Sequence, residues 1–177
     1  MINAALVPFM LLAALGFVLS VAAHVASIAG VQIRGGQMIW LLHLGIFVVW
    51  LPTVLLVSRI MRGERRQDMW KLTLSGCPAW MRLAAKVLLG YIIVNFVYFI
   101  STAGRGGHYS GDAPPAVIRG FSGHWMLFYG VAFMTLYSAY RNPVLLRQRV
   151  CRNGHPVTRS DEFCPVCGEN AGAQPDS

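Results

Sequence analysis

Four metal-ligating side chains gather near the carboxyl end of this chain. They follow the spacing Cys-x3-His-x8-Cys-x2-Cys and are Cys151, His155, Cys164 and Cys167. Zinc prefers four sulfur and nitrogen ligands in a tetrahedron, and two closely spaced pairs joined by a short loop can supply them. Because the protein fills all four positions, no place remains for a bound water. The spacing therefore predicts a structural Zn²⁺ site and not a catalytic one.

The same segment resembles the small zinc-ribbon tails of bacterial proteins. The likeness rests on Gly154-His155 and on the run Phe163-Cys164-Pro165-Val166-Cys167-Gly168, and it covers residues 151–168 only. It implies a structural zinc and not a reaction. So short a segment cannot bury a useful core, and we expect it to fold only when metal binds. The competing interpretation, a frayed tail with unrelated cysteines, is disfavoured by the ligand spacing.

Three further histidines, His24, His43 and His124, form a second candidate site. All three fall near the same face of the predicted membrane domain, and the first two lie roughly 8 Å deep at 1.5 Å rise per residue. Imidazoles at matched depth on neighbouring helices are what haem b or copper ligation would require. The competing interpretation is hydrogen bonding between helices. Paired histidines on both sides, as in many membrane cytochromes, are absent from the sequence.

The composition places these residues in a membrane protein. Of 177 residues, 55% are hydrophobic and 12% are charged, whereas soluble domains carry about 25% charged residues. Four segments are long enough to cross a hydrocarbon core of roughly 30 Å; they cover about residues 4–29, 38–58, 79–103 and 121–140. A cleaved signal peptide is the alternative for the first, but that segment lacks an early basic residue and is too long. We therefore predict an all-α bundle of four transmembrane helices over residues 1–141.

Basic residues predict the orientation of this bundle. They crowd between the second and third predicted spans and again after the fourth, and such segments usually face the cytoplasm. Both can lie there only if the chain crosses four times with the amino and carboxyl termini cytoplasmic, as a multi-pass protein of the cell (inner) membrane. This placement accounts for most of the net charge of +8, so we expect no nucleic-acid partner. The expected partners are the lipid bilayer and another membrane or cytoplasmic protein.

The remaining segments complete the predicted domain organisation. Residues 142–150 are predicted as a juxtamembrane linker helix, 151–168 as the zinc knuckle and 169–177 as a flexible tail. On the third span, four polar residues at helical spacing should point into the bundle; they are Tyr91, Asn95, Tyr98 and Thr102. Hydrogen bonds between helices explain such a stripe without a ligand, and a quinone-like molecule is the alternative.

Two functional hypotheses follow from these features. The first is an integral membrane subunit, scaffold or assembly-type protein whose cytoplasmic zinc knuckle contacts another protein. The second is a haem- or transition-metal-binding redox protein that uses the three histidines near the outer face. A third possibility, a membrane enzyme that acts on lipid at the outer face, would need a set of carboxylates, and Asp112 is the only acid predicted on the outer side. We therefore expect no enzymatic activity.

Overall fold

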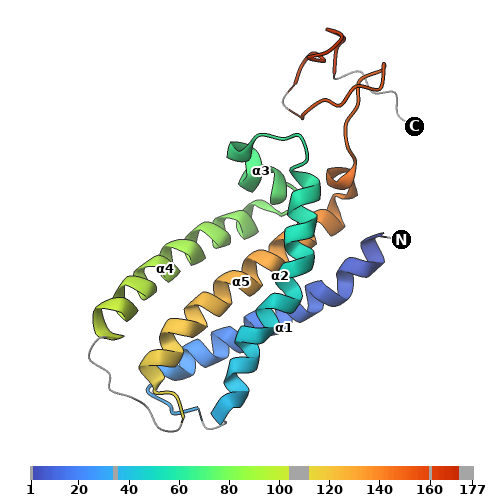
Figure 1. Ribbon diagram of the computed structural model, residues 1–177. Helices are drawn as coiled ribbons and strands as arrows, with labels where there is room; N and C mark the ends of the chain where they lie inside the picture. The colour runs from blue at the N-terminus through green and yellow to red at the C-terminus, as the bar shows by residue number, and fades with distance from the viewer. Residues whose placement is uncertain (1, 34–35, 104–111, 160, 172–177) are drawn as a thin grey trace.

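Four long helices form a bundle that carries a small irregular tail at one end (Figure 1). The computed structural model describes residues 2–33, 36–103, 112–159 and 161–171. The long helices are α1 (Ile2–Ile28), α2 (Leu41–Ile60), α4 (Ala79–Ala103) and α5 (Pro115–Arg141). Short helices join them; these are η1 (Gly36–Trp40), η2 (Arg66–Asp68), α3 (Met69–Thr73) and η3 (Pro143–Leu146). Within the described ranges the only β pairing is two isolated bridges in the tail.

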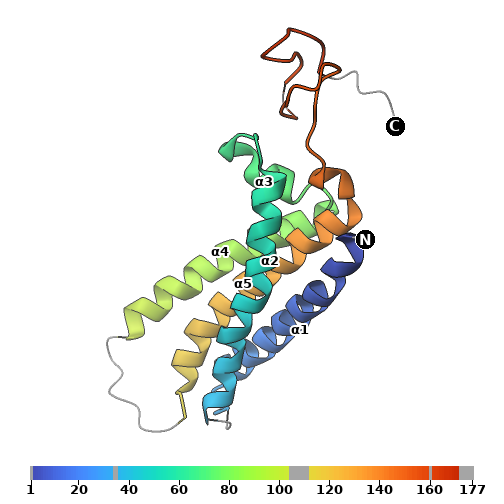
Figure 2. The same cartoon turned by 45° about the vertical axis from the view of Figure 1, so that its right-hand side comes forward.

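Helix α5 is the centre of the bundle. It packs against α1, α2 and α4, and Figures 1 and 2 both show it between α4 on one side and α1 with α2 on the other. Its buried residues include small ones, such as Gly120, Gly123 and Ala132, which let neighbouring helices approach closely. A side chain at Gly123 would collide with the Asn95 amide of α4. The fold therefore depends on small residues along α5.

One large side chain of α5, Tyr129, is held between glycines of two neighbouring helices. Its ring occupies the space that a Cβ would need at Gly16 of α1, and its hydroxyl occupies the space at Gly45 of α2. The hydroxyl donates a hydrogen bond of 2.8 Å to the carbonyl of Leu42. Because the ring is buried and its polar end is paired, this arrangement joins three helices at one position.

Three helical segments in the described part of the chain are long and apolar enough to cross a membrane. They are Ala4–Ile28, Met38–Ile60 and Ala79–Thr102, close to the predicted ranges. Only 11% to 22% of the most apolar window in each is buried, so their side chains mostly face outward, as lipid contact requires. These helices mark a membrane protein, although α5, which contains the predicted span 121–140, is not among them. The fourth span stays a prediction.

The ends of the helices show how the chain runs. Leu6 near the start of α1 packs with Ile60 at the end of α2 and with Leu136 and Ala139 near the end of α5. Leu145 of η3 joins the same cluster, which leads into the tail. The start of α1 and the ends of α2 and α5 therefore share one end of the bundle, here called the knuckle end. The opposite end is called the distal end (Figure 2).

Candidate functional site

The four predicted ligands come together in the tail. One ligand atom from each of Cys151, His155, Cys164 and Cys167 lies within 4.8 Å of the other three. The Cys151 Sγ is 3.7 Å from the Cys167 Sγ and 3.6 Å from the His155 Nδ1. Two thiolates bound to one tetrahedral zinc at about 2.3 Å would stand about 3.8 Å apart. The cluster could therefore hold a metal ion such as zinc.

Two glycine-containing turns bring the ligand pairs together. In the first, the Gly154 amide donates to the Cys151 carbonyl and the Cys151 amide donates to the His155 carbonyl, both at 2.9 Å. In the second, the Gly168 amide donates to the Cys164 carbonyl at 2.9 Å. Both glycines have positive φ, of 81° and 71°, a conformation that other residues adopt with strain. The glycines in the sequence pattern are therefore required by the turns.

The surroundings of the thiols differ. Hydrogen bonds from the Glu169 amide, Asn153 and His155 lower the pKa of Cys167 to about 6, which favours the thiolate that binds metals. Burial raises the pKa of the Cys151 thiol. Beyond the ligands, the described part of the tail (residues 147–159 and 161–171) buries only Val157 and Ala171, so it has almost no apolar core of its own. Such a segment needs another source of stability, which a metal held by the four ligands would supply.

An ion pair fastens the tail to the bundle. Glu64, in the connection after α2, is 3.0 Å from the Arg159 guanidinium, and the two side chains are 6% and 20% exposed. The Arg159 amide also donates to this carboxylate at 3.2 Å, and the guanidinium donates to the Leu145 carbonyl at 3.1 Å. The predicted linker helix over residues 142–150 appears as the short η3, followed by extended chain.

The predicted histidine layer is divided by α5. His24 of α1 lies on the α4 side, where its Nδ1 is 2.8 Å from the Ser122 hydroxyl and its Nε2 is 2.5 Å from the Tyr91 hydroxyl. Both ring nitrogens are thus paired with protein groups. Hydrogen bonding between helices, the simpler of the two interpretations, accounts for this histidine.

The other two histidines lie together between α2 and α5. The rings of His43 and His124 are stacked, with centroids 5.9 Å apart and planes 17° from parallel. Trp125 donates from Nε1 to the His43 Nδ1 at 3.1 Å. Phe121 and Phe128 pack beside this pair, which makes the surroundings aromatic. The structure therefore brings together two of the three predicted histidines.

Arg119, which precedes the predicted span 121–140, lies within α5 and pairs with Asn95 of α4. Its Nε donates to the Asn95 Oδ1 at 3.2 Å, its carbonyl accepts from the Asn95 amide at 3.2 Å, and its guanidinium lies 4.4 Å from the centre of the Tyr98 ring. Asn95 is buried, as its place in the polar stripe predicted, but Tyr91 and Tyr98 are 41% and 50% exposed, so the prediction that the stripe points into the bundle is wrong for these two residues. In the sequence, Arg119 is an isolated arginine just before an uncharged stretch. An arginine at the membrane interface gives the same pattern, so the sequence could not distinguish the two positions.

Cys77 is the only cysteine outside the metal cluster. Its thiol is buried and donates to the Met134 carbonyl of α5, with a sulfur-to-oxygen distance of 3.2 Å. Burial raises the pKa of Cys77, so the reactive thiolate is disfavoured. Its position is that of a packing residue.

Comparison of the whole chain with known protein families, with characterised proteins and with solved structures found no match.

Proposed function

We propose that the chain is a multi-pass membrane subunit, scaffold or assembly-type protein whose cytoplasmic knuckle, residues 151–168, binds structural zinc and contacts another protein. The three apolar helices support the membrane placement. Helix α5 serves as the fourth span, because α1, α2 and α4 pack against it and its Ser122, Thr135 and Ser138 side chains are buried away from lipid. Basic residues at the knuckle end favour the cytoplasmic side of the cell membrane for that end and for both termini.

The observation that carries the docking role is the exposure of two apolar side chains on the knuckle. Phe163 is 60% exposed and Val166 is 66% exposed. They flank the ligand Cys164, so a metal-organised turn presents them. A closed tetrahedral site leaves no open position for a reaction, and exposed aromatic groups on a small rigid turn are typical anchors of protein contacts.

A crosslinking experiment tests this role. A photoreactive amino acid at Val166 in the full chain should give one discrete protein adduct in cells, and Phe163→Ser should abolish the adduct while zinc content stays unchanged. Arg152→Ser changes another exposed residue of the knuckle and should leave the adduct intact. An adduct that survives Phe163→Ser, or the absence of any adduct, would contradict the docking role.

The redox hypothesis is the second candidate, and the observation behind it is the proximity of His43 and His124. Two imidazoles with centroids 5.9 Å apart can share one metal ion or hold the edge of a cofactor. The visible spectrum of the purified protein distinguishes the candidates: a Soret or copper band that disappears in His43→Ala supports the redox role. A colourless protein that contains zinc alone contradicts it.

A further inference from the structure

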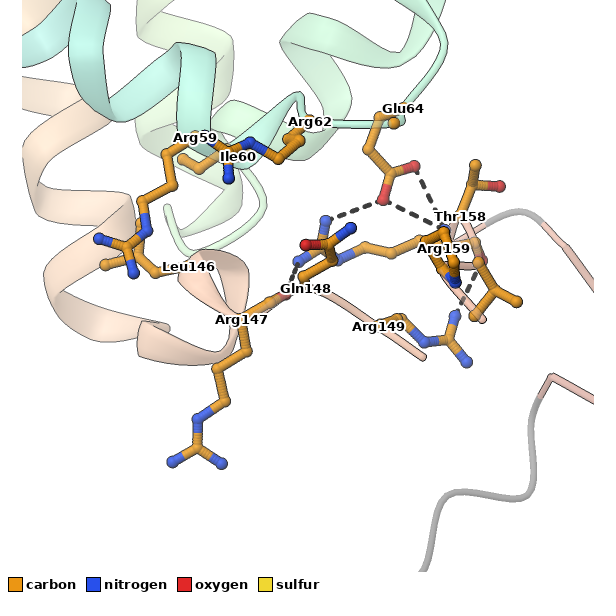
Figure 3. Close-up of a pocket in the computed structure, with 13 residues that line it drawn as sticks. Arg59, Ile60, Arg62, Glu64, Leu146, Arg147, Gln148, Arg149, Thr158 and Arg159 are labelled. Carbon is orange, nitrogen blue, oxygen red and sulfur yellow. Dashed lines mark hydrogen bonds and ion pairs between the residues drawn. The ribbon is translucent and has the colours of Figure 1, made fainter. Parts of the chain in front are cut away.

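A cavity of about 290 Å³ lies where the knuckle meets the bundle (Figure 3). Three separate segments supply its walls: the end of α2 with the residues after it, the chain that follows η3, and the knuckle. The volume is far above the roughly 10–15 Å³ that a single water molecule needs, so a small polar group fits. None of the four metal ligands lines it.

The walls of this cavity are strongly basic. They include five arginines and a single carboxylate, Glu64; the arginines are Arg59, Arg62, Arg147, Arg149 and Arg159. Glu64 is already paired with Arg159. Unit charges of the same sign within one small cavity repel each other, so an anion at its centre would stabilise the arrangement.

Three of these arginines, Arg59, Arg62 and Arg147, are exposed and have no guanidinium partner among the described residues, and Figure 3 shows Arg59 and Arg147 extending outward from the cavity wall. Arg159 is occupied by Glu64 and by main-chain carbonyls, and Arg149 donates to the Ala171 carbonyl at 2.9 Å. Among the described residues, no hydrogen bond or ion pair engages the guanidinium groups of Arg59, Arg62 and Arg147. Guanidinium groups bind phosphate oxygens with two parallel hydrogen bonds, which makes phosphate the fitting anion.

The level of the cavity relative to the membrane indicates which molecule supplies the phosphate. Arg59 and Ile60 line it, and Ile60 ends the apolar segment Met38–Ile60. A group at the end of a membrane span lies at the level of the lipid headgroups. We infer that this arginine cavity binds the phosphate headgroup of an anionic phospholipid, which it recognises by the same chemistry as a free phosphate. The inference rests on the membrane placement of α2 and not on the docking role of the knuckle.

Native mass spectrometry of the full-length protein in detergent tests the inference. The probes are phosphatidylglycerol, zwitterionic phosphatidylcholine and inorganic pyrophosphate. The double variant Arg62→Gln/Arg147→Gln removes two exposed charges from the cavity. The matched control Arg82→Gln/Lys86→Gln removes two exposed charges from the start of α4, outside the cavity. Zinc content and the thermal midpoint of unfolding, measured for each variant, identify any loss of lipid binding that is caused by misfolding. If a double variant misfolds, the corresponding single variants are tested in its place.

The inference predicts tighter binding of phosphatidylglycerol than of phosphatidylcholine. The cavity variant should bind phosphatidylglycerol roughly 30-fold more weakly, and each single variant about fivefold more weakly, whereas the control should change less than threefold. Equal losses in the two double variants would show a diffuse surface charge and overturn the inference, as would no loss in either. Binding of pyrophosphate alone would overturn the lipid source and assign the cavity to a soluble phosphate.

Discussion

Neutralising Glu64 by the substitution Glu64→Gln should release the knuckle from the bundle. The carboxylate is 6% exposed and accepts hydrogen bonds from both the guanidinium and the main-chain amide of Arg159. A hydrogen bond to a charged group contributes about 1.5–3 kcal/mol, so two such bonds contribute about 3–6 kcal/mol before solvent screening. Since Arg159 is 20% exposed and glutamine keeps one acceptor, we discount this for solvent screening and expect a loss of about 1–3 kcal/mol, or roughly 5- to 150-fold in the docking equilibrium.

Limited proteolysis measures this equilibrium. Trypsin cleaves after Arg159, whose side chain is engaged by Glu64 in the docked state, and when opening and closing are fast the rate of cleavage at this site follows the open population. The rate should rise by the same factor in Glu64→Gln. Glu162→Gln removes a carboxylate from an exposed position on the knuckle and should leave the rate unchanged. A rate for Glu64→Gln within twofold of the unmodified protein, or an equal rise in the Glu162 control, would refute the role assigned to the ion pair.

Two further predictions concern the bundle. Gly16→Ala should lower the free energy of unfolding by about 1–3 kcal/mol, because the new methyl group overlaps the Tyr129 ring; Gly90→Ala, where the structure leaves open space, should cost nothing in the same thermal unfolding assay. An equal shift in both variants would contradict this packing. The Cys77 thiol should resist iodoacetamide at neutral pH until the protein unfolds, because burial raises its pKa and the Met134 carbonyl holds it. Labelling is followed by mass spectrometry. Rapid labelling of Cys77 in the folded protein would contradict its burial.

The extents of the apolar helices could be predicted from the sequence, because each contains a long apolar run of the length that a membrane span needs. The central position of α5 could not: hydropathy reports how apolar a helix is, and not which neighbours cover it. Helix α5 begins at Pro115, six residues before the predicted span. The prediction left out residues 115–120 because Arg119 makes this run unlike a membrane-spanning sequence. The proline suits the first turn of a helix.

The two candidate sites differ in the same way. The metal ligands are close along the chain, so their spacing alone predicted the cluster. The histidines are far apart along the chain. The sequence predicts how deep each one lies along its helix, but not toward which neighbouring helix it points. Ser122 and His124 are two residues apart, about 200° around α5, so the His24 partner and the His43 partner point to opposite sides. The pair of Glu64 and Arg159 has no local signal, since 95 residues separate its members.

Metal content of the purified full-length protein tests the central claim most directly. Elemental analysis should find one zinc per chain, and Cys164→Ala should abolish it, because the cluster then lacks one of its four ligands. Cys77→Ala removes the one cysteine outside the cluster and should keep the zinc. Unchanged zinc in Cys164→Ala, or loss of zinc in Cys77→Ala, would contradict a metal-organised knuckle.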